Sequence, residues 1–341
     1  MTIASLFYAF CGAAFAAAIG SLGAFVFTGL LCIISVAALF GGNDSTFFLF
    51  SITFGGYLAP CITFAGGAAA LHYARSRGYL PYGEGKNIVR ALTPLKKPDI
   101  IAFGGFIGVI GYVINFALSK AGWGAVTDTG ATTIVIIALA LKLIFDHTLT
   151  GTLDEKSKKL GRYNVESASW QPAMTRCFDK AFYGTVFGGL AACCTALIMK
   201  SSNQAFATYG IYLPFAISII VLGLCMIGVE APVTHHITLC AAYCMAFGGG
   251  NIGWGIVTGI LSVFLADFMS RTFYVHGDCH VDPPSMAILT TPIFMMYLLP
   301  KTGLYKIAPD ILPYAVVAVV LVGCAIVQFA GKKNEAVAVT A

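Results

Sequence analysis

The residues best suited to chemistry lie in one short segment, residues 276–282. It contains His276, Asp278, His280 and Asp282, with a cysteine among them. Imidazole titrates near neutral pH, and ionisable groups beside membrane spans commonly line paths for ions or protons. Because a Pro-Pro pair follows directly, the segment cannot continue a helix and its last residue is held extended. The pattern predicts an irregular binding or gating element between two helices, with a polar surface loop or a metal site as alternatives.

Two further polar clusters lie where apolar stretches meet or end. The first occurs in the sequence Glu-Ala-Pro-Val-Thr-His-His and supplies Glu230, Thr234, His235 and His236. The second, Asp146 with His147, ends an apolar run. Charged groups within membrane spans are costly and usually face a polar cavity, so both clusters are candidates for solute or ion binding. The alternative places them at the membrane interface, with Glu230 capping the next helix.

The elements that must position these residues are membrane-spanning helices. Of 341 residues, 58% are hydrophobic and 10% are charged, whereas soluble domains carry about 25% charged residues. This excludes a water-soluble enzyme. At about 20 residues a span, the chain predicts an all-α polytopic bundle of ten or eleven spans. The apolar runs are 3–20, 21–41, 47–73, 100–119, 130–145, 181–199, 209–229, 231–249, 252–274, 284–300 and 311–330.

Basic residues are concentrated in two loops, 74–99 and 146–180. Short loops rich in Lys and Arg stay in the cytoplasm, so both loops are predicted to face it. Eleven spans then place the N-terminus outside, and ten place it inside. We therefore expect a multi-pass protein of the inner (cytoplasmic) membrane. Most of the eleven cysteines lie within apolar runs, where cysteine acts as a small hydrophobic residue.

Two short matches indicate an internal duplication. Gly-Trp-Gly-x-Val-Thr occurs at 122–127 and at 253–258, and Ala-Pro occurs at 59–60 and at 231–232. The order predicts two parallel repeats of about four helices, with the solute path between them. The expected division is an N-terminal hairpin (1–45), a first repeat (46–205), a second repeat (206–305), a C-terminal helix (306–330) and a short cytoplasmic tail (331–341).

One stretch resembles a known family. The region from Ala231-Pro232 to Leu289, with Arg271-Thr272 and then His280-Val-Asp-Pro-Pro-Ser-Met-Ala-Ile-Leu, resembles the HPP-type integral membrane proteins. That resemblance implies four-helix membrane units, here duplicated, and a path for a small anion such as nitrite. The chain departs from the His-Pro-Pro motif, because Val281 and Asp282 separate His280 from the two prolines.

These features favour a transporter or channel for a small polar or anionic solute. Its path would be lined by residues 230–236 and 276–282. The alternative is a membrane-embedded metal-dependent enzyme with His276, Asp278 and His280 as ligands, and a third is an assembly subunit. HExxH, GxSxG and P-loop motifs do not occur, so enzymatic activity is the less favoured hypothesis. The expected partners are the lipid bilayer, a small solute or ion and further copies of the chain, and binding of nucleic acid is not expected. No cofactor is expected, and a bound metal ion is kept as an alternative.

The first testable prediction concerns orientation. Single cysteines introduced into the loops 74–99 and 146–180, and into the tail 331–341, should not react with an impermeant thiol reagent added to intact cells, because their basic residues resist translocation. A cysteine at position 44, between the second and third apolar runs, should react and serves as the control. Efficient labelling of either basic loop from outside would contradict the orientation.

Overall fold

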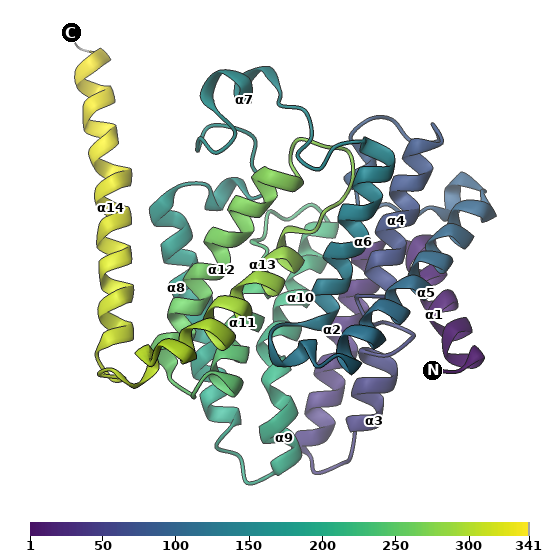
Figure 1. The fold of residues 1–341 in the computed structure, drawn as a ribbon, viewed down its shortest axis with the longest axis horizontal. Coiled ribbons are helices and arrows are strands. Elements are labelled where there is room, and N and C mark those ends of the chain that lie inside the picture. The colour runs from purple at the N-terminus through teal and green to yellow at the C-terminus, as the bar shows by residue number, and fades with distance from the viewer. Residues whose placement is uncertain (340–341) are drawn as a thin grey trace.

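The chain folds into one bundle of helices joined by loops (Figure 1). A computed structural model describes residues 1–339, and of 331–339 it gives the helical backbone alone, so the side chains of the tail predicted at 331–341 lie outside what is described. No strand occurs within 1–339, which confirms the all-helical class. The helices are α1 (Ile3–Ile19), α2 (Ser21–Phe40), α3 (Thr46–Phe48), α4 (Thr63–Ser76), α5 (Pro98–Lys120), α6 (Thr129–Asp146), α7 (Glu155–Leu160), α8 (Cys177–Ile198), α9 (Gln204–Tyr209), α10 (Leu213–Met226), α11 (His235–Phe247), α12 (Ile252–Phe273), α13 (Pro283–Pro292) and α14 (Leu312–Val339).

Seven helices in the described range are long and apolar enough to cross a membrane, which makes this a multi-pass membrane protein. They are α2, α5, α6, α8, α9 with α10, α12 and α14. Ten or eleven spans were predicted. In the runs at 47–73 and 231–249, α4 and α11 have 14 and 13 residues, shorter than a span of about 20, and α13 continues as a π-helix (Ile293–Leu298) and a 3-10 helix (Leu299–Thr302). Prolines ahead of each helix break the runs, since proline cannot continue a preceding helix.

The connecting loops gather at two ends of the bundle. The loops 77–97 and 147–176 lie at one end, here called the basic end, together with the last turn of α12, whose carbonyls at 271 and 272 accept hydrogen bonds from Arg162. The turns 41–45 and 199–203 lie at the opposite end, where the Asn203 amide donates to the carbonyl of Leu39. Figure 1 shows α7 at the basic end and α9 at the opposite end. Both basic loops therefore share one side, as the orientation prediction requires.

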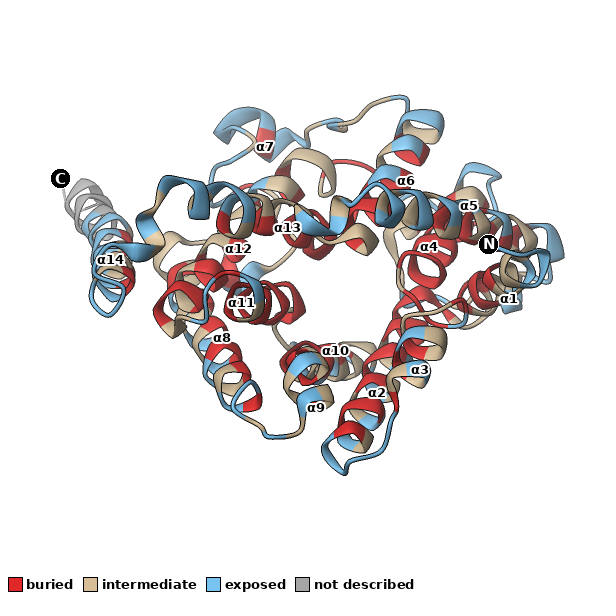
Figure 2. Ribbon diagram, turned by 60° about the horizontal axis from the view of Figure 1, so that its bottom comes forward, coloured by how far each residue is buried: buried red, intermediate tan, exposed pale blue. Residues whose placement is uncertain are grey.

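Five helices of the first part of the chain, α1, α2, α4, α5 and α6, pack on one another in the same pattern as five later helices, α8, α10, α11, α12 and α13. α1 packs on α4 and α5, and α8 packs on α11 and α12 in the same way. α6 contacts α4 and α5, as α13 contacts α11 and α12, and α2 lies on α4 as α10 lies on α11. Across the centre, α2 packs on α10 and α6 packs on α13. Figure 2 shows α2, α4, α6, α10, α11 and α13 arranged around the centre of the bundle.

Helices with matching contacts run in opposite directions. α1 ends at the basic end, where the amide of Leu92 donates to the carbonyl of Ala17, whereas α8 begins there after the loop 147–176. α4 and α6 likewise run toward the basic end, while α11 and α13 run away from it. α5 leaves the basic end and α12 returns to it. These contacts do not describe the parallel arrangement expected from the sequence.

The two Gly-Trp-Gly segments do not occupy equivalent places, so that prediction is wrong. Residues 123–125 form a 3-10 turn between α5 and α6, whereas residues 253–255 lie in the first turns of α12. By its contacts, α12 corresponds to α5. The helix that follows the first Gly-Trp-Gly is α6, and by its contacts it corresponds to α13. The two Ala-Pro pairs do precede matching helices, α4 and α11. Glycine and tryptophan recur at membrane interfaces for general reasons, so a three-residue match does not identify a repeat.

Small residues allow the closest helix contacts. On α12, a Cβ added at Gly259 would lie 2.6 Å from the Cα of Gly188 and 2.7 Å from the carbonyl oxygen of Gly184, both on α8. The matching contact between α1 and α5 uses Gly108, where a Cβ would collide with the side chain of Ala13. Small residues let helix backbones approach closely where apolar lipid gives no hydrophobic drive for association.

Replacing Gly259 with valine should therefore destabilise the bundle. The added side chain meets backbone atoms of α8 that cannot move aside, so we expect a loss of about 1–3 kcal/mol in the free energy of unfolding. Unfolding of the purified protein in mixed micelles of mild detergent and SDS measures this loss. Gly323→Val on α14 is the matched control, because a Cβ there meets nothing within 4 Å. Equal stability of the two variants would refute the close-packing argument.

Candidate functional site

A cavity of about 360 Å³ lies in the centre of the bundle, between α2, α4 and α6 on one side and α10, α11 and α13 on the other. Four helices begin at its wall. Pro60 and Cys61 precede α4, Asp128 precedes α6, Val233 precedes α11 and Asp282 precedes α13, and all of these residues line the cavity. Helix N-termini carry partial positive charge, and four of them converge on this cavity.

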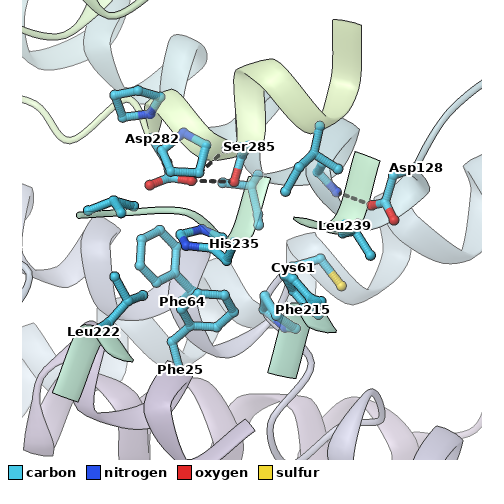
Figure 3. A pocket seen from close by; sticks show the side chains of 18 of the residues that line it. Phe25, Cys61, Phe64, Asp128, Phe215, Leu222, His235, Leu239, Asp282 and Ser285 are labelled. Carbon is cyan, nitrogen blue, oxygen red and sulfur yellow. Dashed lines mark hydrogen bonds between the residues drawn. The ribbon is translucent and has the colours of Figure 1, made fainter. Parts of the chain in front are cut away.

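Two of these N-termini are capped by carboxylates. One oxygen of Asp128 accepts a hydrogen bond from the amide of Ala131 at 2.6 Å, and one oxygen of Asp282 accepts from the amide of Ser285 at 2.8 Å. Figure 3 shows the two carboxylates apart on the cavity wall, each bonded to the first turn of its own helix. Aspartate is among the best N-cap residues because its side chain satisfies an amide that has no partner within the helix. The caps thus explain why both helices start inside the bundle.

Histidine surrounds one of the carboxylates. The Nε2 atom of His280 lies 3.3 Å from Asp282 Oδ1, and its Nδ1 atom lies 3.2 Å from the carbonyl oxygen of Lys86. His235, the first residue of α11, lines the same cavity, is 5% exposed, and has no hydrogen-bond partner at Nδ1. The structure thus brings His235, His280 and Asp282 together, as the sequence suggested for His280, Asp282 and one of the two adjacent histidines.

The other carboxylate was missed by the sequence analysis. Asp128 accepts a hydrogen bond at 2.7 Å from the hydroxyl of Tyr243, which comes from α11 across the cavity. A signal for this role was present, because Thr-Asp-Thr directly precedes an apolar helical run and so has the pattern of an N-cap. Tyr243 lies within an apolar run and gave no such signal.

Aromatic rings form the remaining wall. The ring of His235 lies 5.2 Å from that of Phe25, and the ring of His280 lies 5.6 Å from that of Phe64. Phe215 and Leu222 of α10 complete this side (Figure 3). Among the lining residues there is no lysine or arginine. The cavity is therefore apolar over most of its surface, with carboxylates, imidazoles and hydroxyls as its polar groups.

A second polar cluster lies between the cavity and the basic end. Arg75 of α4 forms an ion pair of 2.6 Å with Asp278, and Lys142 of α6 forms one of 2.9 Å with Asp146. The imidazole of His72 lies 3.5 Å from Asp146 and donates from Nδ1 to the carbonyl of Asp278 at 3.0 Å. A separate cavity of about 280 Å³ adjoins this cluster. Ion pairs and hydrogen bonds thus tie the segment 274–282 to α4 and α6.

The structure separates the remaining candidates from the central cavity. His276 lies at the second cavity, 3.6 Å from Asp154, and burial with the nearby Arg162 lowers its pKa against the opposing effect of Asp154. His236 is buried against the ring of Trp170 and does not line the central cavity. Three further residues have other positions: Thr234 is a buried residue preceding α11, Glu230 is exposed in the loop before it, and His147 is the exposed residue that ends α6 in a left-handed conformation.

The proposed metal ligands do not converge. His276 and Asp278 lie at the second cavity, while His280 lies at the first. Among the described residues, no three His, Cys, Asp or Glu side chains are arranged to hold one metal ion. Residues 274–279 form turns and bends, so side chains two residues apart in this segment do not share one face.

Comparison with known proteins gives one match. The model of a family of unknown function, DUF7973, matches residues 1–176 and, separately, residues 153–308. No curated protein and no solved structure matches the chain. The matched family offers no support for a resemblance to HPP-type proteins.

The buried ion pair at Lys142 gives a test of the second cluster. Lys142 is fully buried, so Lys142→Met should leave Asp146 with only His72 and one backbone amide as partners. Breaking a buried pair from one side costs about 3–5 kcal/mol, and we expect the lower end of that range in unfolding measurements. Glu155→Gln, which removes the exposed pair with Lys158, is the control and should cost less than about 1 kcal/mol. Similar costs for both variants would mean that the cluster is solvated.

Proposed function

This chain belongs to the DUF7973 family, and we propose that it is a membrane transporter that carries a small amphipathic solute through the central cavity. The observation that carries the proposal is the convergence of four helix N-termini on one cavity inside a membrane protein. Irregular backbone at membrane depth is tolerated where it lines a cavity, and transporters place such broken helices at their solute sites.

The two halves of the bundle act as inverted repeats in this proposal. The first unit is 3–146 and the second is 177–292, which replaces the boundaries 46–205 and 206–305 and the parallel order expected from the sequence. Three observations support it: the matched contacts of five helix pairs, their opposite directions, and the separate matches of one family model to 1–176 and 153–308. Units related in this way can rock against each other about a fixed site, opening it to either side in turn.

The chemistry of the cavity indicates the kind of solute. Ligand cavities of roughly 300–1,000 Å³ hold drug-sized molecules, and this one lies near the lower limit. Its walls are mainly aromatic and aliphatic, with polar groups concentrated at Asp128, Asp282, His235 and His280. A small inorganic anion, which the HPP resemblance implies, would meet carboxylates and no lysine or arginine among the lining residues. We therefore favour a solute with an apolar body and one polar end.

The second cluster serves as a gate at the basic end. The segment 274–282 belongs to the second unit, and its ion pair with Arg75 and hydrogen bonds with His72 and Asp146 attach it to the first unit. Opening a path on that side requires these contacts to break together. By the positive-inside rule, we place the basic end in the cytoplasm and the protein in the cytoplasmic membrane.

The experiment compares two neighbouring positions on α10. Leu222 lines the cavity and Leu224 is 44% exposed on the outer face of the same helix. Liposomes containing the purified protein are incubated with labelled phenylalanine, phenylacetate and benzyltrimethylammonium, and with lactate and glucose as purely polar comparisons. We expect wild type and Leu224→Trp to retain at least one phenyl-bearing probe, and Leu222→Trp to lose at least nine-tenths of that uptake because the indole fills the cavity.

A second pair guards against misfolding of one variant. On α6, Ile134 lines the cavity and Ile136 is 43% exposed, so Ile134→Trp and Ile136→Trp repeat the comparison from the other unit. Monodisperse protein of wild-type stability is required of each variant. Equal uptake by the cavity and surface variants, or no protein-dependent uptake of any probe, would overturn the proposal; uptake of lactate or glucose alone would overturn the amphipathic assignment.

A further inference from the structure

The two nitrogen atoms of His280 face different acceptors. Nδ1 lies 3.2 Å from the carbonyl oxygen of Lys86, and a carbonyl can only accept, so Nδ1 carries a hydrogen. Nε2 lies 3.3 Å from Asp282 Oδ1. A neutral ring that is protonated at Nδ1 presents a lone pair at Nε2, and a lone pair facing an ionised carboxylate is repelled. Both contacts are therefore hydrogen bonds at the same time only when a second proton lies between Nε2 and Oδ1.

The other oxygen of the carboxylate is already supplied with two hydrogens and does not need this proton. Asp282 Oδ2 accepts hydrogen bonds from both the amide and the hydroxyl of Ser285. The amide carries its own hydrogen and is fixed in the first turn of α13, so it requires an acceptor at Oδ2. The additional proton is thus confined to the contact between His280 and Asp282, where it is shared by an imidazole and a carboxylate.

The matching carboxylate provides an internal comparison. Asp128 also caps a helix at the cavity, but its oxygens accept from the amide of Ala131 and from the hydroxyl of Tyr243. Each of these donors brings its own hydrogen, so Asp128 is satisfied as an ionised carboxylate without an added proton. Two N-caps in matching places therefore differ in one respect: Asp282 has an imidazole as its partner, and Asp128 has a phenol hydroxyl.

The surroundings of the pair are largely uncharged. From α11, His235 faces the pair; from the connecting segment, the ring of Tyr274 lies 5.1 Å from that of His280. The loop 77–97 contributes Lys86, whose ammonium lies 5.2 Å from the Tyr274 ring and donates to the carbonyl of Val275. The nearest walls of α2, α4 and α10 present the rings of Phe25, Phe64 and Phe215, which do not titrate. His236 follows His235 on α11, with the two rings 6.0 Å apart. The other ionisable groups near the pair or on the cavity wall are Asp128 and Tyr243 across the cavity, Tyr212, Cys61 and Cys225 on its wall, and Asp278 and Cys279 on the adjoining segment.

We propose that His280 and Asp282 form a proton-binding site that couples transport to a proton gradient; the coupling rests on the proposed function, and the site itself does not. In the protonated state the pair is neutral overall, as imidazolium with carboxylate or as imidazole with carboxylic acid. Release of the proton to the cavity leaves neutral imidazole and an ionised carboxylate, so the pair gains one negative charge. Loading and unloading therefore change the net charge of the cavity by one.

Nuclear magnetic resonance of the full chain in lipid nanodiscs tests the site without any solute. With ¹⁵N-labelled histidine and ¹³C-labelled aspartate, His280 is identified among six histidines by the signal that His280→Gln removes. At pH 7 we expect the ¹⁵N signal of a protonated Nδ1. We also expect either the ¹⁵N signal of a protonated Nε2 or the ¹³C signal of a protonated carboxyl group, and Asp282→Asn should remove that ¹³C signal. Asp282→Asn should convert His280 to a neutral ring protonated at Nδ1 alone.

Asp128→Asn is the matched control, and the His280 signals in it should stay as in wild type. An unprotonated Nδ1 in wild-type His280 would overturn the shared proton. The same conclusion would follow if wild type showed no protonated carboxyl group and His280 had the same protonation in wild type and in Asp282→Asn. If Asp282→Asn does not fold, Ser285→Ala leaves His280 and the carboxylate in place, and the wild-type signals alone still decide the protonation of Nδ1 and Nε2.

Coupling is tested with whichever phenyl-bearing probe the liposomes retain. An imposed pH difference of two units should change wild-type accumulation at least tenfold between its two directions, and Asp282→Asn should abolish this dependence. Wild-type uptake that ignores the gradient would overturn the coupling while leaving transport intact. A failure of all probes would refute the transporter instead, and the resonance experiment would still decide whether the proton site exists.

Discussion

The structure depends on one constraint, which is that a helix beginning inside a membrane protein must satisfy its first backbone amides without water. An unsatisfied amide in such a place costs several kcal/mol, so each internal helix start requires acceptors. At α4 and α11 these are backbone carbonyls of the residues just before the helix. Asp128 and Asp282 meet this requirement for α6 and α13. Because they do so with carboxylates, negative charge is placed beside the positive ends of the two helices, and both are stabilised.

The same constraint makes the centre of the bundle the natural place for a site. Short helices that end halfway through the protein leave a space between their starts, and the aromatic side chains of α2 and α10 do not fill it. Structural carboxylates therefore become lining groups of the cavity. Where the carboxylate is bound only by fixed donors, as at Asp128, its role stays structural; where a histidine is its partner, as at Asp282, the cap also becomes a chemical group.

The segment 274–282 connects this chemistry to the basic end. Its turns and bends place His280 and Asp282 at the central cavity and His276 and Asp278 at the second one. On the second side Asp278 is paired with Arg75 of the other unit, while Lys142 pairs with Asp146 on its own helix. A movement that separates the units at this end would break the Arg75–Asp278 pair and shift the backbone that carries His280. The gate and the proton site are thus parts of one continuous chain segment.

Composition and periodicity determined that this is a helical membrane protein, because long apolar runs without charges have no other stable form in water or lipid. Lys and Arg placement also grouped the two basic loops, and the Pro-Pro pair marked 276–282 as irregular. The sequence could not show that α4 and α11 are shorter than a full span, because hydropathy does not register a break inside an apolar run. Nor could it pair Asp128 with Tyr243 or Arg75 with Asp278, since each pair joins segments more than 100 residues apart. Only the packing of the helices shows which polar groups share a cavity and which helices have matching contacts but opposite directions. The reason is that the three-dimensional path of the chain decides which side chains meet.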